Sequence, residues 1–202
     1  MSTLRVYIDF KSPAAYLALK PTLALAQRTG TILDWQPIRT RQSAVPVAPD
    51  PEQKDQEDKG TRHRRVRAQA RRDTHLFYAK VQGIPMRFPA AEFPATDLAL
   101  AALAAVTDSD AFVEAAFHAY WADAADLNTP ATVEQLLSAC GTETGGLASL
   151  PVADLLAQKA EQAIADQVID APGYVIGEQV FIGREHLPWI EELLCIESST
   201  PS

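Results

Sequence analysis

Cysteine is scarce in this sequence of 202 residues. Only two are present, Cys140 and Cys195, and they lie far apart with no CxxC pair. Small secreted domains held by disulfides contain cysteine much more densely, and a zinc site needs clustered Cys and His ligands. The four histidines show neither HxxxH nor HExxH spacing, so the sequence gives no support to a metal site.

Net positive charge and long apolar runs are also absent. The formal net charge is -8, so we expect no bulk attraction to nucleic acid or to anionic lipid. The longest apolar stretch, residues 98–106, is far shorter than the ~20 residues that span a bilayer. The first residues lead into a strand-like run without the apolar region of a signal peptide. We therefore expect a soluble, cytoplasmic protein that binds neither nucleic acid nor a membrane.

The first forty residues predict a strand, a helix and a second strand. Apolar residues alternate with period 2 over residues 4–10, as in a strand. Ser12 is a good N-cap, Pro13 suits the first helical position, and Gly30 stands where a helix ends. Pro21 falls inside this helix, where we expect a kink. Residues 31–35 form the second expected strand.

The end of the chain predicts a helix, two strands and a helix. Residues 152–167 carry one apolar stripe of helical spacing. Short strands follow at residues 174–176 and 180–182, and the turn between them begins with Gly177, as in a type II′ hairpin. The last helix is expected over residues 185–194.

Only helices are predicted between these two ends. Residues 40–59 indicate a loop, and residues 61–81 a helix whose apolar side carries Val66, Ala70, Phe77 and Val81. Three further helix starts are expected, at Thr96, at Asp108 or Asp110, and at Thr129.

This order of elements is the plan of an α/β, thioredoxin-like fold with an inserted all-helical domain. Residues 1–40 and 165–202 would form the thioredoxin-like domain, and residues 41–164 the helical insertion. The composition, 47% hydrophobic and 22% charged, is that of an ordinary globular protein.

Motifs at both ends resemble those of 2-hydroxychromene-2-carboxylate isomerases and kappa-class glutathione transferases. Residues 7–18, YIDFKSPAAYLA, resemble the DF-x-SP-x-x-YLA opening of these proteins. Residues 171–177, APGYVIG, resemble their cis-proline segment, and residues 181–187, FIGREHL, the glycine-to-helix turn that follows. A weaker similarity over residues 83–94 extends the resemblance to nearly the whole chain. It implies a DsbA-type thioredoxin-like fold that binds glutathione, and a homodimer, which is common among these proteins.

The start of the first helix holds Ser12 and Pro13 where redox members of this superfamily have CxxC, so this position cannot exchange disulfides. A helix N-terminus stabilises a nearby anion, and a glutathione thiolate docked there could accept a hydrogen bond from Ser12. The resemblance implies that Ser12 is catalytic: it would activate the glutathione thiol, which adds reversibly to a conjugated double bond. The alternative is that Ser12 is only an N-cap, and both roles can hold together.

The resemblance also implies residues that bind glutathione. Pro13 stands next to the thiol, the Ala171-Pro172 bond would be cis, and Ala171 would offer its backbone to the cysteinyl unit. Without the resemblance, a trans proline turn would be the simpler expectation. Gly173 departs from the family, which usually has Thr or Ser there.

Arg184 and Glu185 also depart from the family pattern at the start of the last helix. Arg184 could pair with a carboxylate of glutathione and Glu185 with its ammonium. Ordinary residues of a solvated first helical turn are the alternative.

A basic run precedes the middle of the chain. Residues 59–72 contain seven Lys or Arg and no acid before Asp73. They could form a cationic mouth for carboxylate ligands, or a solvated face balanced by the acids of residues 50–58. Binding of nucleic acid is the weaker alternative, because no aromatic residues are interleaved.

We therefore expect a glutathione-dependent cis/trans isomerase that acts on an aromatic carboxylic acid. A kappa-like glutathione transferase is one alternative. A thioredoxin-like binding protein without turnover is the other.

Overall fold

Both ends of the chain contribute to one four-stranded sheet. The structure is a computed structural model that describes residues 2–42, 58–90, 92–106, 108–142 and 146–199. The strands β1 (Thr3–Ile8), β2 (Ile32–Pro37), β3 (Gly173–Ile176) and β4 (Gln179–Ile182) lie in the order β2-β1-β3-β4. β1 runs parallel to β2 and antiparallel to β3, and β3 and β4 form a hairpin. This confirms the thioredoxin-like sheet, in which the first and last segments of the chain are neighbours.

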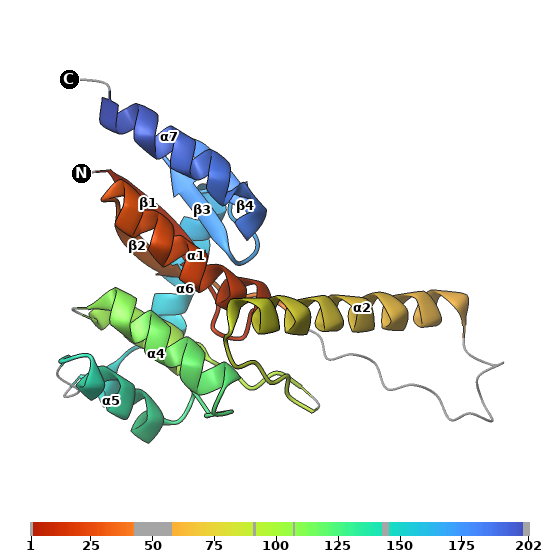
Figure 1. The fold of residues 1–202 in the computed structure, drawn as a ribbon. Helices are drawn as coiled ribbons and strands as arrows, with labels where there is room; N and C mark the ends of the chain where they lie inside the picture. The colour runs from red at the N-terminus through yellow and green to blue at the C-terminus, as the bar shows by residue number, and fades with distance from the viewer. Residues whose placement is uncertain (1, 43–57, 91, 107, 143–145, 200–202) are drawn as a thin grey trace.

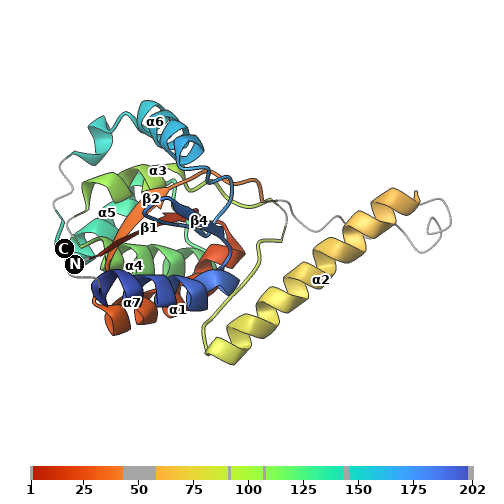
Figure 2. The same ribbon diagram turned by 90° about the horizontal axis from the view of Figure 1, so that it is seen from above.

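Helices cover both faces of the sheet. α1 (Pro13–Thr29) and α7 (Leu187–Ser199) lie side by side on one face, and α6 (Val152–Ala165) lies on the other (Figures 1 and 2). α1 begins and ends as predicted: the Ser12 side chain accepts a hydrogen bond from the Ala15 N–H, and Gly30 takes a left-handed conformation with φ 66°. The helix continues through Pro21.

Three further helices and two 3-10 turns pack beside the β2 edge. They are α3 (Asp97–Ala102), the 3-10 turn η2 (Leu103–Ala105), α4 (Ser109–Trp121), α5 (Pro130–Ala139) and the 3-10 turn η3 (Leu147–Ser149). The N-caps of α3, α4 and α5 are Thr96, Asp108 and Thr129. Thr96 and Thr129 are as predicted, and Asp108 is one of the two starts that the sequence left open for α4. One hydrophobic core joins these helices to the sheet domain. The buried Trp121 also donates its Nε1–H to the Phe10 carbonyl oxygen at 2.9 Å.

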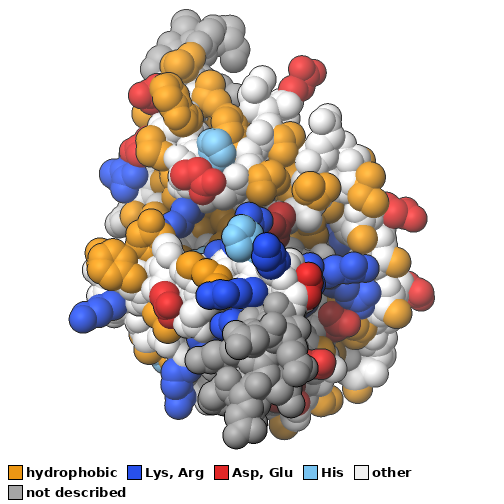
Figure 3. All heavy atoms as spheres, turned by 90° about the vertical axis from the view of Figure 1, so that its right-hand side faces the viewer, with side chains coloured by type: hydrophobic (Ala, Val, Ile, Leu, Met, Phe, Trp, Pro, Cys, Tyr) orange, Lys and Arg blue, Asp and Glu red, His pale blue; other side chains and the backbone are white. Residues whose placement is uncertain are grey.

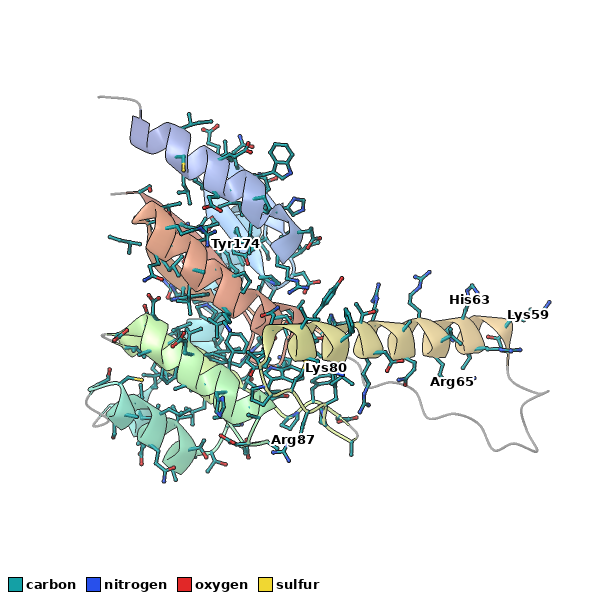
Figure 4. The ribbon with its side chains drawn as sticks, in the orientation of Figure 1. Lys59, His63, Arg65, Lys80, Arg87 and Tyr174 are labelled. Atoms are coloured by element: carbon teal, nitrogen blue, oxygen red, sulfur yellow. The ribbon has the colours of Figure 1, made fainter. Side chains whose placement is uncertain are left out.

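α2 (Lys59–Gln82) projects away from the rest of the molecule (Figure 1). Ala79 is its one buried residue among those that the structure describes. The apolar side predicted from the sequence does not pack within the chain: Phe77 is 62% exposed and Val81 68%. Lys59 and His63 stand at the end farthest from the sheet (Figure 4).

Two details differ from the expected elements. The last helix begins as a 3-10 turn, η4 (Arg184–His186), and α7 then continues to Ser199. The expected loop of residues 40–59 lies mostly outside the described residues. The division into two domains at residues 40/41 and 164/165 stays a prediction. Within the described part of the chain, no helix is both long and apolar enough to cross a bilayer.

Candidate functional site

The start of α1 meets the cis-proline segment at the centre of the candidate site. Ser12 is buried, with 1% of its surface exposed. Its hydroxyl accepts a hydrogen bond from the Ala15 N–H at 3.2 Å and donates one to the Ala171 carbonyl oxygen at 3.0 Å. The Ala171-Pro172 peptide bond is cis, as the resemblance implied. The fold thus brings together two motifs that stand at opposite ends of the sequence.

The polar groups at this junction already have partners within the chain. The Ser12 hydrogen is donated to Ala171, and the Ala171 N–H donates to Asp170 Oδ1 at 2.8 Å. The N-cap role of Ser12 is confirmed, and its catalytic role stays a prediction. To donate to a thiolate, the Ser12 hydroxyl would have to rotate away from the Ala171 carbonyl.

A buried carboxylate fixes the turn between β1 and α1. Asp9 is fully buried, and its Oδ2 accepts hydrogen bonds from the N–H and the hydroxyl of Thr40 at 2.7 and 2.9 Å. Its Oδ1 accepts from the Lys11 N–H and from the Thr96 hydroxyl, each at 3.2 Å. The Lys11 ammonium lies 2.8 Å from Asp9 Oδ2. Asp9 therefore joins the turn before Ser12 to the ends of two other segments. We did not predict this, because no local pattern connects these residues.

Gly173, the position that departs from the family pattern, has no room for a side chain. A Cβ placed there would collide with Cγ1 of Val168 and would lie 3.2 Å from the Asp170 carbonyl oxygen. Val168 itself is buried. The glycine at position 173 therefore fits closely against Val168.

A pocket of about 380 Å³ opens between α1, α2 and the turn after β4. We call it the Arg184 pocket; Arg67, Arg71, His75, Arg184 and Glu185 are among its lining residues. The Arg184 guanidinium lies over the Tyr78 ring, 4.3 Å from its centroid. The predicted residues Arg184 and Glu185 thus share one pocket, which also includes Ala14, two residues after Ser12.

Part of the basic run faces this pocket, as the interpretation of a cationic mouth requires. We did not predict that His75 and Tyr78 would join it. A signal was available, since Arg67, Arg71 and His75 repeat every four residues and so lie along one side of a helix. Arg72 lines the second pocket described below, whereas Lys59, Arg62 and Arg64 are exposed along α2.

A second pocket, of about 220 Å³, lies beside the first. We call it the Phe88 pocket; Pro13, Arg41, Arg72 and Phe88 are among its lining residues. Arg71 and His75 line both pockets.

The surroundings of His75 disfavour its protonated form. Burial lowers the pKa of this imidazole, and the positive charges of Arg184 and Arg71 lower it further. Among the described residues, no group of three or more His, Cys, Asp or Glu side chains is placed to hold a metal ion.

The similarity to known proteins extends over nearly the whole chain. The model of the DSBA-like thioredoxin domain family matches residues 3–194. A 2-hydroxychromene-2-carboxylate isomerase of Sphingobium xenophagum is 28% identical over 201 residues, which cover 95% of this chain and 97% of that protein.

Two solved structures share the fold. That of a 2-hydroxychromene-2-carboxylate isomerase superimposes with a TM-score of 0.74 at 20% identity, over 98% of each chain. The cytosolic disulfide reductase DsbM of Pseudomonas aeruginosa, solved with glutathione (GSH), superimposes with a TM-score of 0.61 at 18% identity, again over 98% of each chain.

Proposed function

The chain belongs to the family of DSBA-like thioredoxin domains, and from this premise we propose that it is a glutathione-dependent cis/trans isomerase of the 2-hydroxychromene-2-carboxylate type. The similarity to an isomerase over 95% of the chain supports an isomerase. Disulfide exchange at the start of α1 has no chemical basis, because Ser12, Pro13, Ala14 and Ala15 hold no sulfur. We infer that a bound molecule supplies the thiol.

The charges of the Arg184 pocket carry the proposal that this molecule is glutathione. At neutral pH glutathione has two carboxylates, one ammonium and one thiol. The pocket offers three guanidinium groups, from Arg67, Arg71 and Arg184, and one carboxylate, from Glu185. Its volume of about 380 Å³ falls in the usual range for small-molecule sites. The glutathione bound in a protein of similar fold supports the same ligand.

Ser12 and the N-terminus of α1 would activate the thiol. The partial positive charge of a helix N-terminus favours the thiolate over the thiol, and Pro13 and Ala14 place both pockets at this end of α1. In the proposed reaction a C–S bond forms between the thiolate and a conjugated double bond of the substrate. The former double bond then rotates as a single bond, and the C–S bond breaks to release the thiolate and the isomer. Ala171 and Pro172 would frame the cysteinyl unit.

Two assays test this function. Calorimetric titration should show that glutathione binds. If no heat of binding is detected at millimolar glutathione, both the isomerase function and the alternative kappa-like transferase function are contradicted. The absorbance of 2-hydroxychromene-2-carboxylate should then change only when both protein and glutathione are present. Consumption of glutathione into a stable thioether would instead identify a transferase. If Ser12→Ala keeps the full rate, the role of Ser12 is wrong.

We also propose that the protein is a cytoplasmic homodimer in which α2 contacts a second copy. The C-terminal half of α2 exposes a group of apolar side chains, Leu76, Phe77, Tyr78 and Val81. α2 carries eight Lys or Arg residues and one Asp, whereas the whole chain has a net charge of -8. Blue basic side chains gather where α2 points toward the viewer in Figure 3. The remainder of a second copy is strongly negative and therefore complements this helix.

A further inference from the structure

Pro21 leaves one carbonyl oxygen of α1 without its usual helical partner. In an α-helix the carbonyl oxygen of each residue accepts from the N–H four residues later, so the Leu17 oxygen would accept from position 21. Pro21 has no N–H, and a proline ring also crowds the carbonyl four residues before it. The helix nevertheless continues through Pro21 to Thr29. The Leu17 carbonyl oxygen is therefore available to donors from other segments of the chain.

Two side chains from distant segments bond to this oxygen. The Gln82 Nε2–H donates to the Leu17 carbonyl oxygen at 3.1 Å, and the Arg184 Nη1–H donates to it at 3.4 Å. Gln82 is the last residue of α2, which ends beside α1 (Figures 1 and 2), and Arg184 is the first residue of η4. A carbonyl oxygen has two lone pairs, so these two donors fill its capacity.

The bond to Leu17 helps to fix Arg184 in the pocket that is named after it. Leu17 and Arg184 both line the Arg184 pocket. The guanidinium is held by the Leu17 oxygen and by the ring of Tyr78, whose centroid lies 4.3 Å from its Cζ. A guanidinium has five N–H donors, of which Leu17 takes one, so the others can bind an anion. A side chain that is held before binding also loses less conformational entropy when its ligand arrives.

We propose that Pro21 is a positioning residue of the Arg184 pocket: because it has no N–H, the Leu17 carbonyl oxygen can hold the Arg184 guanidinium where it receives a carboxylate of the ligand. The proposal rests on the proposed function only for the identity of that ligand, glutathione. With an N–H at position 21, three donors would compete for two lone pairs. Arg184, which makes the longer of the two present bonds, would then be displaced.

Pro21→Ala tests this role by supplying the missing N–H. It should weaken glutathione binding in calorimetry about two- to fivefold, the effect of one partly exposed ion pair. Its midpoint of urea denaturation should rise, because alanine favours a helix interior far more than proline does. A merely structural role of Pro21 would raise the midpoint and leave the affinity for glutathione unchanged. In the Arg184→Met background, Pro21→Ala should weaken binding no further. Unchanged affinity in Pro21→Ala, or the same loss in the Arg184→Met background, would overturn the proposal.

Removal of the other donor should rescue the effect of Pro21→Ala. Gln82→Met leaves the N–H at position 21 and Arg184 as two donors for two lone pairs, so the variant Pro21→Ala, Gln82→Met should regain affinity for glutathione. Within the described part of the chain, Gln82 Oε1 is buried without a hydrogen-bond partner, so its loss should cost little stability. No recovery of affinity in the double variant would overturn the competition between donors.

Pro130→Ala is the matched control. Pro130 is the first residue of α5, where an N–H would have no helical partner, and it lines neither the Arg184 pocket nor the Phe88 pocket. This variant should bind glutathione as the wild type does. Weaker binding by Pro130→Ala would contradict the proposal, because the effect would then follow any exchange of proline for alanine in a helix.

Proton NMR without glutathione separates this proposal from the proposed function. The ring of Tyr78 should shift the side-chain resonances of Arg184 upfield, and these resonances are identified by their loss in Arg184→Met. Pro21→Ala should move them toward the values of an exposed arginine, whereas unchanged resonances would overturn the proposal. If the resonances move but the wild type binds no glutathione, the proposed function is contradicted and the effect of Pro21 on Arg184 is supported.

Discussion

The Ser12 hydroxyl lies 3.0 Å from the Ala171 carbonyl oxygen, and this one hydrogen bond joins the start of α1 to the cis-proline segment 159 residues later. The Ser12 hydroxyl oxygen also caps α1, because it accepts a hydrogen bond from the Ala15 N–H. Ser12 thus adds to the β1–β3 pairing a second link between the two ends of the chain, at the site where the thiol is proposed to react. Its substitution should affect stability as well as activity.

Ser12→Ala should lower the free energy of unfolding by about 1–2 kcal/mol, because it removes an N-cap and leaves the buried Ala171 carbonyl without this partner. Urea denaturation measures the change. Thr129→Ala is the control, since the Thr129 side chain begins α5 without a cap hydrogen bond. This variant should lose clearly less free energy of unfolding than Ser12→Ala. Equal losses in the two variants would show that the bond to Ala171 contributes nothing.

Asp9→Asn should be more damaging than the loss of an exposed carboxylate. The buried Asp9 carboxylate accepts bonds from Thr40 and Thr96 and pairs with Lys11, and hydrogen bonds to charged groups contribute about 1.5–3 kcal/mol each. We expect a loss of roughly 2–3 kcal/mol in urea denaturation. Glu191→Gln, which removes an exposed partner of Arg28, should change stability far less. A comparable loss in the two variants would contradict the anchoring role of Asp9.

Gly173→Ser, which introduces one of the two residues that the family resemblance leads us to expect there, should destabilise this protein. Its Cβ would collide with Val168, and overpacking of this kind costs roughly 1–3 kcal/mol. Adding Val168→Ala should make the double variant more stable than the sum of the two single losses predicts, as a thermal or urea double-mutant cycle would measure. Gly146→Ala is the control, because apart from its chain neighbours no atom of the described residues lies within 4 Å of an added Cβ there. Simple additivity would show that Val168 does not exclude the side chain.

Elements with strong local signals were predictable from the sequence. Ser12 with Pro13 and Gly30 mark the two ends of α1, and Thr96, Asp108 and Thr129 mark three further helix starts. At Ser12 and Asp108 the capping side chain accepts a hydrogen bond from the backbone N–H three residues on, whereas Thr96 and Thr129 begin their helices without such a bond. The alternating strands are visible for a similar reason, since their period is set by local geometry.

What depends on packing between distant segments could not be predicted. The apolar side of α2 has the spacing of a buried helix, yet Phe77 and Val81 face solvent in the single chain. The partners of Asp9 stand 31 and 87 residues away, and the sequence has no pattern that pairs them. The shared wall of Arg71 and His75 likewise exists only once α2 crosses the start of α1.

Acidification should destabilise the protein through His75. Its pKa is lowered in the folded state by burial and then by Arg184 and Arg71, whereas in the unfolded chain it is about 6.5. Below pH 6.5 the unfolded state therefore binds more protons, so stability falls as the pH drops toward the folded pKa. Unfolding free energies measured between pH 5 and 8 should show this slope in the wild type and less of it in His75→Gln. An identical slope in both would assign the effect to other groups.

The exposed apolar side chains of α2 should hold two copies of the chain together. We expect the wild type to have twice the mass of one chain in light scattering at micromolar concentration. Phe77→Glu and Val81→Glu place a carboxylate among these apolar side chains, so each should yield a folded monomer, because both positions are exposed within the chain and neither supports its core. Ile169→Glu is the matched control: Ile169 is apolar and 82% exposed but lies outside α2. It should remain dimeric. A monomeric wild type would remove the dimer, and dissociation by Ile169→Glu alone would place the interface elsewhere on the molecule.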